Sequence, residues 1–225
     1  MSTMKLGIIF GTHRTHSNTL GIFKYIQQII STYPTIQPDP IFLGESLGHP
    51  LPLLIDQMPA SIPLASCPEA YTLPEIRAWS NTVLGWDGIL IVAPQYNRGP
   101  PAVLKNAFDQ LYSEWEGVPV GLVSCGSRGG NRMQIVLEEM LGDGLKMDLV
   151  GMVGVKIPKE SILGDEKVKG DEDWVKGYEG ELKGLLNELE GKMKKRFQKK
   201  KIDEAEKGEE GKEKEVKEHV EENAT

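Results

Sequence analysis

The chain has few cysteines and no long apolar run. Cys67 and Cys125 are its only two thiols among 225 residues, and two thiols cannot form a disulfide framework. We therefore expect a reducing compartment, namely the cytosol. No apolar stretch approaches the roughly 20 residues that a membrane-spanning helix needs, which excludes a transmembrane protein. The N-terminus also lacks the long apolar region and the cleavage site of a secretion signal.

Positive charge is also in deficit. The 33 acidic residues outnumber the 26 basic ones, and the net charge of −7 argues against a nucleic-acid partner. Basic residues gather over residues 192–201, but acidic residues dominate residues 203–222 directly after them. Large apolar side chains are almost absent beyond Glu204, so this end cannot offset its ordering entropy by burial. We predict one folded domain over residues 1–190 and a charged tail over residues 191–225 that is disordered or a frayed helix.

Within the domain, short apolar runs alternate with segments of helical periodicity. The strand candidates are residues 5–10, 40–43, 87–93, 118–124 and 149–157. Helical spacing covers residues 20–30, 102–115, 133–141 and 174–193. Apolar strands between helices are typical of a parallel sheet covered on both faces, and right-handed crossovers limit it to a doubly wound arrangement. We predict an α/β, flavodoxin-like fold with a five-stranded sheet in the order 2-1-3-4-5.

One segment interrupts this alternation. Residues 43–69 are rich in proline, which forbids a regular helix there. A connection of this length is usually functional or part of an interface.

Ligands of such sheets bind at the carboxyl ends of the strands, where the chain has three unusual loops. The first covers residues 11–19 and supplies hydroxyls, an amide, a guanidinium and a helix start, which together suit a phosphate. It is neither a P-loop nor a dinucleotide fingerprint. Helix capping by Ser17 or Asn18 is the alternative. His13 and His16 are three residues apart, but no cysteine or carboxylate lies nearby in sequence, so we expect no metal site.

The second loop covers residues 94–101. Tyr96 can lie flat on a ring and Asn97 can bond ring carbonyls or N–H groups, although an ordinary strand-to-helix turn remains the alternative. The third loop covers residues 124–130, where three glycines permit close approach of the backbone to a ligand. The alternative is that this loop is only a flexible connector. Cys125 in this loop is interpreted as a small buried residue rather than a reactive thiol.

The three loops carry the motifs G-T-x-R-x-x-S-N, P-Q-Y-N-R-x-x-P-x-x-L-K-N-A-F-D and S-x-G-x-x-G-G. In this spacing the chain resembles the NADPH-dependent FMN reductase family over residues 4–155. The resemblance implies that the FMN phosphate is held by Thr12, Arg14, Ser17 and Asn18. It implies that the isoalloxazine ring or the ribityl chain is contacted by Pro94, Gln95, Tyr96 and Asn97. It also implies that the other edge of the ring is lined by Ser124, Gly126 and Gly129.

The resemblance further implies an activity. NADPH or NADH would deliver hydride to N5 of FMN, and a quinone, an azo compound or free flavin would then accept it in a ping-pong mechanism. The flavin carries this chemistry, so no catalytic side chain is assigned. A homodimer is expected, with the proline-rich segment and the helix after Pro100 as its surface. Many members of the family have Glu where this chain has Gln95.

Two other functions stay open. A flavodoxin-like electron carrier would also bind FMN, but the first loop lacks the alternating Thr/Ser-Gly pattern of flavodoxins. A flavin-dependent regulatory or scaffold protein would use the charged tail as its docking element.

Overall fold

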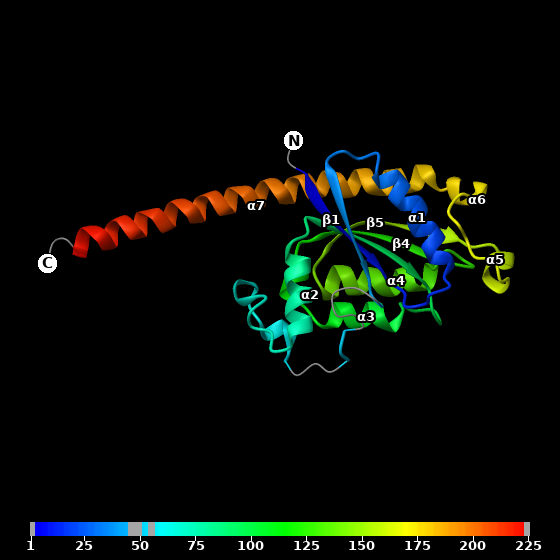
Figure 1. Cartoon of the computed structure of the whole chain (residues 1–225), viewed down its shortest axis with the longest axis horizontal. Coiled ribbons are helices and arrows are strands. Elements are labelled where there is room, and N and C mark those ends of the chain that lie inside the picture. The colour runs from blue at the N-terminus through cyan, green and yellow to red at the C-terminus, as the bar shows by residue number, and fades with distance from the viewer. Residues whose placement is uncertain (1–2, 45–50, 54–56, 223–225) are drawn as a thin grey trace.

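The computed structural model describes residues 3–44, 51–53 and 57–222, with side chains up to residue 202. Its centre is a five-stranded, all-parallel sheet in the order β2-β1-β3-β4-β5 (Figure 1). The strands are β1 Met4–Phe10, β2 Ile36–Phe42, β3 Gly88–Pro94, β4 Pro119–Gly126 and β5 Asp148–Lys156. The predicted flavodoxin-like fold and strand order are therefore confirmed.

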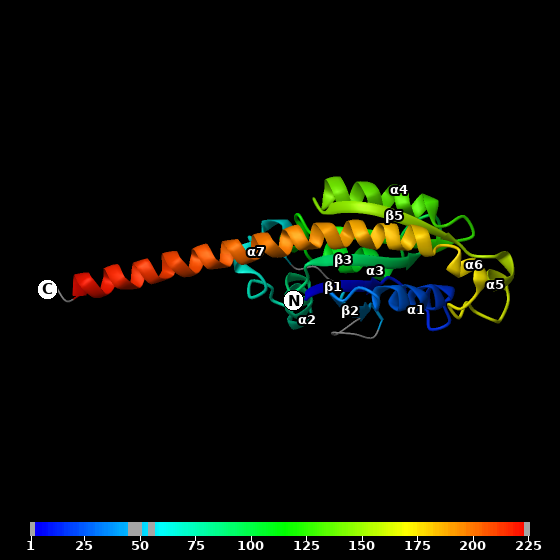
Figure 2. The same cartoon turned by 90° about the horizontal axis from the view of Figure 1, so that it is seen from above.

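Helices cover both faces of the sheet (Figures 1 and 2). A separate hydrophobic core lies beneath the helices on each face. One core joins α1 Asn18–Ile30 and α7 Glu179–Glu222 to one face. The other joins α2 Pro74–Leu84, α3 Ala102–Asp109 and α4 Asn131–Glu139 to the opposite face. The short helices α5 Lys159–Leu163 and α6 Asp173–Lys176 lie between β5 and α7. The central strand β3 is buried at every position, as its uninterrupted apolar sequence predicts.

Some elements differ from their predicted bounds. The strand β2 begins at Ile36, four residues earlier than predicted, and it contains Pro38 and Pro40. Prolines are tolerated here because β2 is an edge strand and the ladder needs N–H donors on one side only. The helix α3 ends at Asp109, and a separate 3₁₀ turn, η3 Ser113–Trp115, follows it. The helix α2 has no counterpart among the predicted helices. Trp79 of α2 and Trp115 of η3 are both fully buried, in agreement with a core role.

The described parts of the proline-rich segment form no α-helix before Pro74, as its prolines predict. Two 3₁₀ turns occur there, η1 Pro59–Ser61 and η2 Leu64–Ser66. The segment is fixed to α3 by two side-chain amides. Asn106 donates to the Leu51 carbonyl oxygen at 3.1 Å, and Gln110 donates to the Pro52 carbonyl oxygen at 2.6 Å. The described start of the segment is therefore anchored beside α3. Residues 45–50 and 54–56, which also belong to the proline-rich segment, lie outside the described residues.

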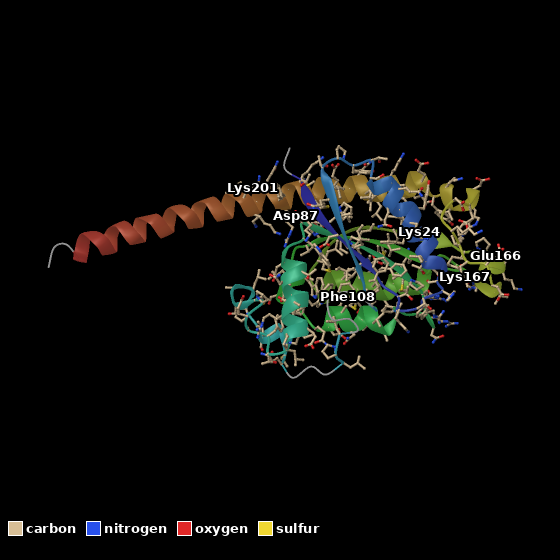
Figure 3. The ribbon with its side chains drawn as sticks, viewed as in Figure 1. Lys24, Asp87, Phe108, Glu166, Lys167 and Lys201 are labelled. Atoms are coloured by element: carbon tan, nitrogen blue, oxygen red, sulfur yellow. The ribbon has the colours of Figure 1, made fainter. Side chains whose placement is uncertain are left out.

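The last helix is longer than its apolar pattern predicts. The helix α7 runs without a break past residue 191, where the predicted tail begins, and its C-terminal half projects from the body (Figures 1 and 2). Its stripe of buried leucines continues to Met193, which is fully buried. Asp87 lies beside α7 at the amino end of the sheet (Figure 3), and Lys200 approaches its carboxylate at 3.5 Å. Residues just beyond 190 thus pack against the sheet.

In the part of the chain that the structure describes, we find no helix that is both long enough and apolar enough to cross a membrane.

Candidate functional site

The three loops meet at the carboxyl ends of β1, β3 and β4, where the fold predicts a ligand. Two contacts join them. The hydroxyls of Thr12 and Tyr96 lie 2.7 Å apart, which ties the first loop to the second. The backbone N–H of Gln95 donates to the Cys125 carbonyl oxygen at 2.9 Å, which ties the second loop to the third. The fold therefore brings the three predicted loops together.

The first loop is held in shape by Thr12, which is almost fully buried. Its hydroxyl accepts a hydrogen bond from the backbone N–H of Arg14 at 3.2 Å. The Arg14 guanidinium lies over the ring of Tyr96, 3.9 Å from the ring centre, as a cation–π contact. Burial raises the pKa of the Tyr96 hydroxyl, so this group is a neutral phenol at physiological pH and can donate to Thr12. The loop thus presents a positive charge fixed beside an aromatic ring.

The start of α1 is held by two successive side chains with different partners. Ser17 caps the helix, because its hydroxyl accepts from the backbone N–H of Thr19 at 3.2 Å. Asn18 is bonded at both ends of its amide: it donates to the Ser161 carbonyl oxygen at 2.7 Å and accepts from the Val168 N–H at 3.0 Å. These contacts fasten the segment after β5 to α1. An anion at this helix start would be met by backbone N–H groups and by Arg14 rather than by the Asn18 amide.

A pocket of about 270 Å³ lies beside the first loop and is lined by both apolar and polar side chains. Its lining residues are Phe10, Thr12, His13, Arg14, Thr15, Leu20, Phe42 and Gly44. His13 and His16 are both exposed. Among the described residues, no group of three or more histidine, cysteine or acidic side chains is arranged as a metal site.

The second loop makes a tight turn with an unusual backbone. Asn97 and Arg98 both have positive φ angles, of 49° and 71°. The turn is closed by a reciprocal pair of hydrogen bonds between Tyr96 and Gly99, at 3.0 and 2.9 Å. This geometry matches a type I′ turn, in which asparagine is favoured but arginine is not. An ordinary strand-to-helix turn would not need two left-handed residues, so the strain at Arg98 marks this loop as a functional candidate.

Gln95 connects the second loop to α4. Its side-chain oxygen accepts hydrogen bonds from the backbone N–H groups of Arg132 and Met133, both at 3.0 Å. The residue at the N-cap of α4 is Gly130, which has no side chain to do this. Gln95 is therefore a cap supplied from another loop, and sequence spacing gives no sign of it.

The third loop can be formed only with glycine at two positions. Gly129 and Gly130 have φ angles of 67° and 73°. A Cβ on Gly129 would lie 2.8 Å from the Gly154 carbonyl oxygen, and one on Gly130 would lie 2.8 Å from Ser124 Cβ. Ser124 is fully buried and donates to the Gly129 carbonyl oxygen at 2.6 Å, so it shapes the loop from within. Gly126 has more room, since its nearest neighbour would be 3.6 Å away.

Cys125 is a structural residue. It is fully buried, and its sulfur lies 3.2 Å from the Thr19 hydroxyl at the start of α1. Burial raises the pKa of its thiol to about 12, so the nucleophilic thiolate is absent at neutral pH. The interpretation of Cys125 as a buried packing residue is confirmed.

These residues fit FMN. The start of α1 and Arg14 suit a phosphate group, and they adjoin a tyrosine ring. The third loop adjoins the second loop at Gly126, where a Cβ would lie 3.8 Å from Gln95 Cβ, and Gly129 and Gly130 let its backbone turn tightly against Gly154 and Ser124. The side chains of Asn18 and Ser124, by contrast, form hydrogen bonds within the protein.

Fold and loops together define a flavodoxin-like α/β protein built to hold a phosphorylated aromatic ligand. The model of the NADPH-dependent FMN reductase family matches residues 4–160, and the chain belongs to this family. It is therefore an oxidoreductase, and the family's chemistry involves FMN and a nicotinamide donor.

Similar proteins agree with this assignment. The chain is 39% identical to the NAD(P)H-dependent FMN reductase LOT6 of Saccharomyces cerevisiae over 164 residues, which are 71% of this chain and 84% of that protein. It is 40% identical to a 2-hydroxy-1,4-benzoquinone reductase of Burkholderia sp over 97 residues, 40% of this chain and 52% of that protein. Among solved structures, the flavoenzyme FerB of Paracoccus denitrificans has a similar fold, with a TM-score of 0.60 at 21% identity over 84% of this chain and 98% of that one.

Proposed function

We propose that the chain transfers hydride from NADPH or NADH, through bound FMN, to a small quinone, an azo compound or free flavin in a ping-pong mechanism. The observation that carries this proposal is the junction of Thr12, Arg14 and Tyr96, where a guanidinium and an aromatic ring adjoin a helix start. FMN, when bound, would accept hydride at N5 and pass it on. The likeness to a benzoquinone reductase supports a quinone as the acceptor.

The chain's own residues would bind and orient the cofactor. Arg14, Thr12 and the backbone N–H groups at Ser17 and Asn18 would hold the phosphate, with Arg14 supplying charge and two-pronged donors. Pro94, Gln95, Tyr96 and Asn97 would contact the ring or the ribityl chain. Ser124, Gly126 and Gly129 would line the other edge, where bare backbone N–H groups can stabilise negative charge that develops on the ring.

The test is an absorbance spectrum of the purified protein with FMN, followed by addition of NADPH without oxygen. Flavin bands that bleach, and recover when a soluble quinone is added, support a reductase. Parallel titrations with NADH rank the two donors, and initial rates at several quinone concentrations give the parallel double-reciprocal lines of a ping-pong mechanism. Protein that binds no FMN refutes the proposal, and bleaching without turnover would instead favour an electron carrier.

We also propose a homodimer formed through the proline-rich segment and α3. Three large apolar side chains of the segment are exposed: Leu53 at 82%, Met58 at 72% and Leu64 at 51%. Exposed apolar side chains of this size suit burial against a second copy. Light scattering should show a dimer that the triple change of these residues to Gln converts to a monomer. The control is Ile135→Gln, which alters an exposed residue of α4. Loss of the dimer in the control alone would move the interface to α4.

We propose the cytosol as the location, because both cysteines are free thiols. The projecting part of α7 supports one further role, a docking element for a regulatory partner (Figure 1). Removal of residues 203–225, which leaves the buried Met193 in place, should keep reductase activity and abolish any such partner's binding. A partner still bound by the shortened protein would refute this role.

A further inference from the structure

Gln95 accepts hydrogen bonds from the start of α4 but does not neutralise the positive charge of this helix end. The first N–H groups of a helix carry a partial positive charge, equivalent to about half an elementary charge. At α4, two of these groups donate to the carboxamide oxygen of Gln95, at 3.0 Å each. A carboxamide accepts hydrogen bonds but has no net charge. The positive end of the α4 dipole is therefore held at the junction of the second and third loops and is not compensated by its cap.

The residues at this helix end carry positive charge, and none in the first turn carries negative charge. The first turn of α4 contains Arg132 and no acidic residue. Arg128 precedes it in the third loop. Gly129 and Gly130, in left-handed conformations, bring the backbone directly from this loop into the helix. The loop that would line the flavin is thus continuous with an uncompensated helix N-terminus.

We propose that Gln95 is a positioning residue that tunes the reduction potential of FMN, by fixing the α4 N-terminus at the site while leaving its positive charge uncancelled. The proposal rests on the proposed function. Hydride transfer moves two electrons and one proton from NADPH, which becomes NADP⁺, and bound FMN gains one negative charge. A positive helix end favours the state with that extra charge, so it makes bound FMN easier to reduce.

The test is Gln95→Glu, which has nearly the same shape. A carboxylate can keep both hydrogen bonds to α4 and adds one negative charge. Without FMN, the variant should melt at a higher temperature than the wild type, because a charged cap stabilises a helix start. With FMN, its reduction potential should fall. We expect the preference for reduced over oxidised FMN to weaken about tenfold, which corresponds to about 30 mV for a two-electron couple.

Two further variants separate charge from fold. Gln28→Glu makes the same charge change at an exposed position in the last turns of α1, and it should leave the potential unchanged. Asn131→Asp adds a charge at the first residue of α4 while Gln95 stays in place, and it should lower the potential in the same direction. This second variant carries the test if Gln95→Glu fails to fold.

The outcomes are distinct. A melting temperature that rises together with a potential that falls supports the proposal. A wild-type potential in both Gln95→Glu and Asn131→Asp, each with FMN bound, overturns it and leaves Gln95 as a helix cap only. A wild-type protein that binds no FMN overturns the proposed function, and this inference with it.

Discussion

Met193 provides a direct test of where the folded domain ends. It lies beyond residue 190, yet it is fully buried under the sheet, where Gly88 leaves room for it. A Cβ on Gly88 would lie 2.5 Å from Met193 Cγ, so the two residues are in intimate contact. Truncation of a buried methionine to alanine costs about 2–5 kcal/mol, through lost burial and the cavity left behind. That is a large share of the roughly 5–15 kcal/mol that holds a domain together.

Other contacts beyond residue 190 contribute less. The Lys192–Asp148 ion pair, at 2.8 Å, is about two-fifths exposed on both sides, so we expect about 0–1 kcal/mol from it. Arg196 donates to the Gly117 carbonyl oxygen at 2.9 Å, and burial lowers the pKa of its guanidinium. Loss of Met193 should therefore be the largest single contribution to the destabilisation that follows removal of residues 191–225.

The assay is urea unfolding followed by circular dichroism. Met193→Ala should lower the free energy of unfolding by about 2–5 kcal/mol. Gly88→Ala should destabilise the wild type by about 1–3 kcal/mol through overpacking, and by clearly less when Met193 is already alanine. Removal of residues 203–225 is the control and should change the free energy little. A truncation after residue 190 that is as stable as the full chain would refute this reasoning.

Three further predictions concern the site loops and the two thiols. Asn18→Ala should weaken binding of FMN and riboflavin by similar factors, since the Asn18 amide holds the segment after β5; a loss confined to FMN in fluorescence titrations would make it a phosphate ligand. Gly130→Ala should lower both stability and FMN affinity, because the Cβ would collide with Ser124 in a left-handed conformation, whereas Gly142→Ala, where a Cβ meets nothing within 4 Å, is its control. Burial raises the pKa of Cys67 and of Cys125 to about 12. Alkylation at pH 8 should thus be slow until urea unfolds the protein, and rapid alkylation of the folded protein would contradict this. Because the folded state binds the thiol protons more tightly than the unfolded state, the free energy of unfolding should fall as the pH rises from about 9 towards 12.

The sequence predicts the fold well because its strands are signalled locally. Uninterrupted apolar runs such as β3 have no other stable place than the centre of a parallel sheet. The helix α2 was missed because the chain before it is rich in proline and its apolar positions are few. The tail boundary at residue 191 is predicted from charge, whereas the apolar spacing that predicts the last helix already includes Met193; neither pattern says that Met193 packs on Gly88 of β3. Such a contact depends on the sheet having formed first.

The site, like the fold, has features that the sequence predicts and contacts that it does not. Loop composition predicts that residues near Thr12, Tyr96 and Gly129 meet, because strand order brings the carboxyl ends of β1, β3 and β4 together. It does not predict which atoms remain free for a ligand. Gln95 bonds a helix 37 residues away, and Asn18 bonds a segment more than 140 residues away. Polar residues in a binding motif can therefore act on the protein rather than on the ligand. At this site the side chains of Gln95, Asn18 and Ser124 set the position of the backbone, and the groups that we propose as cofactor ligands are therefore the backbone N–H groups and Arg14.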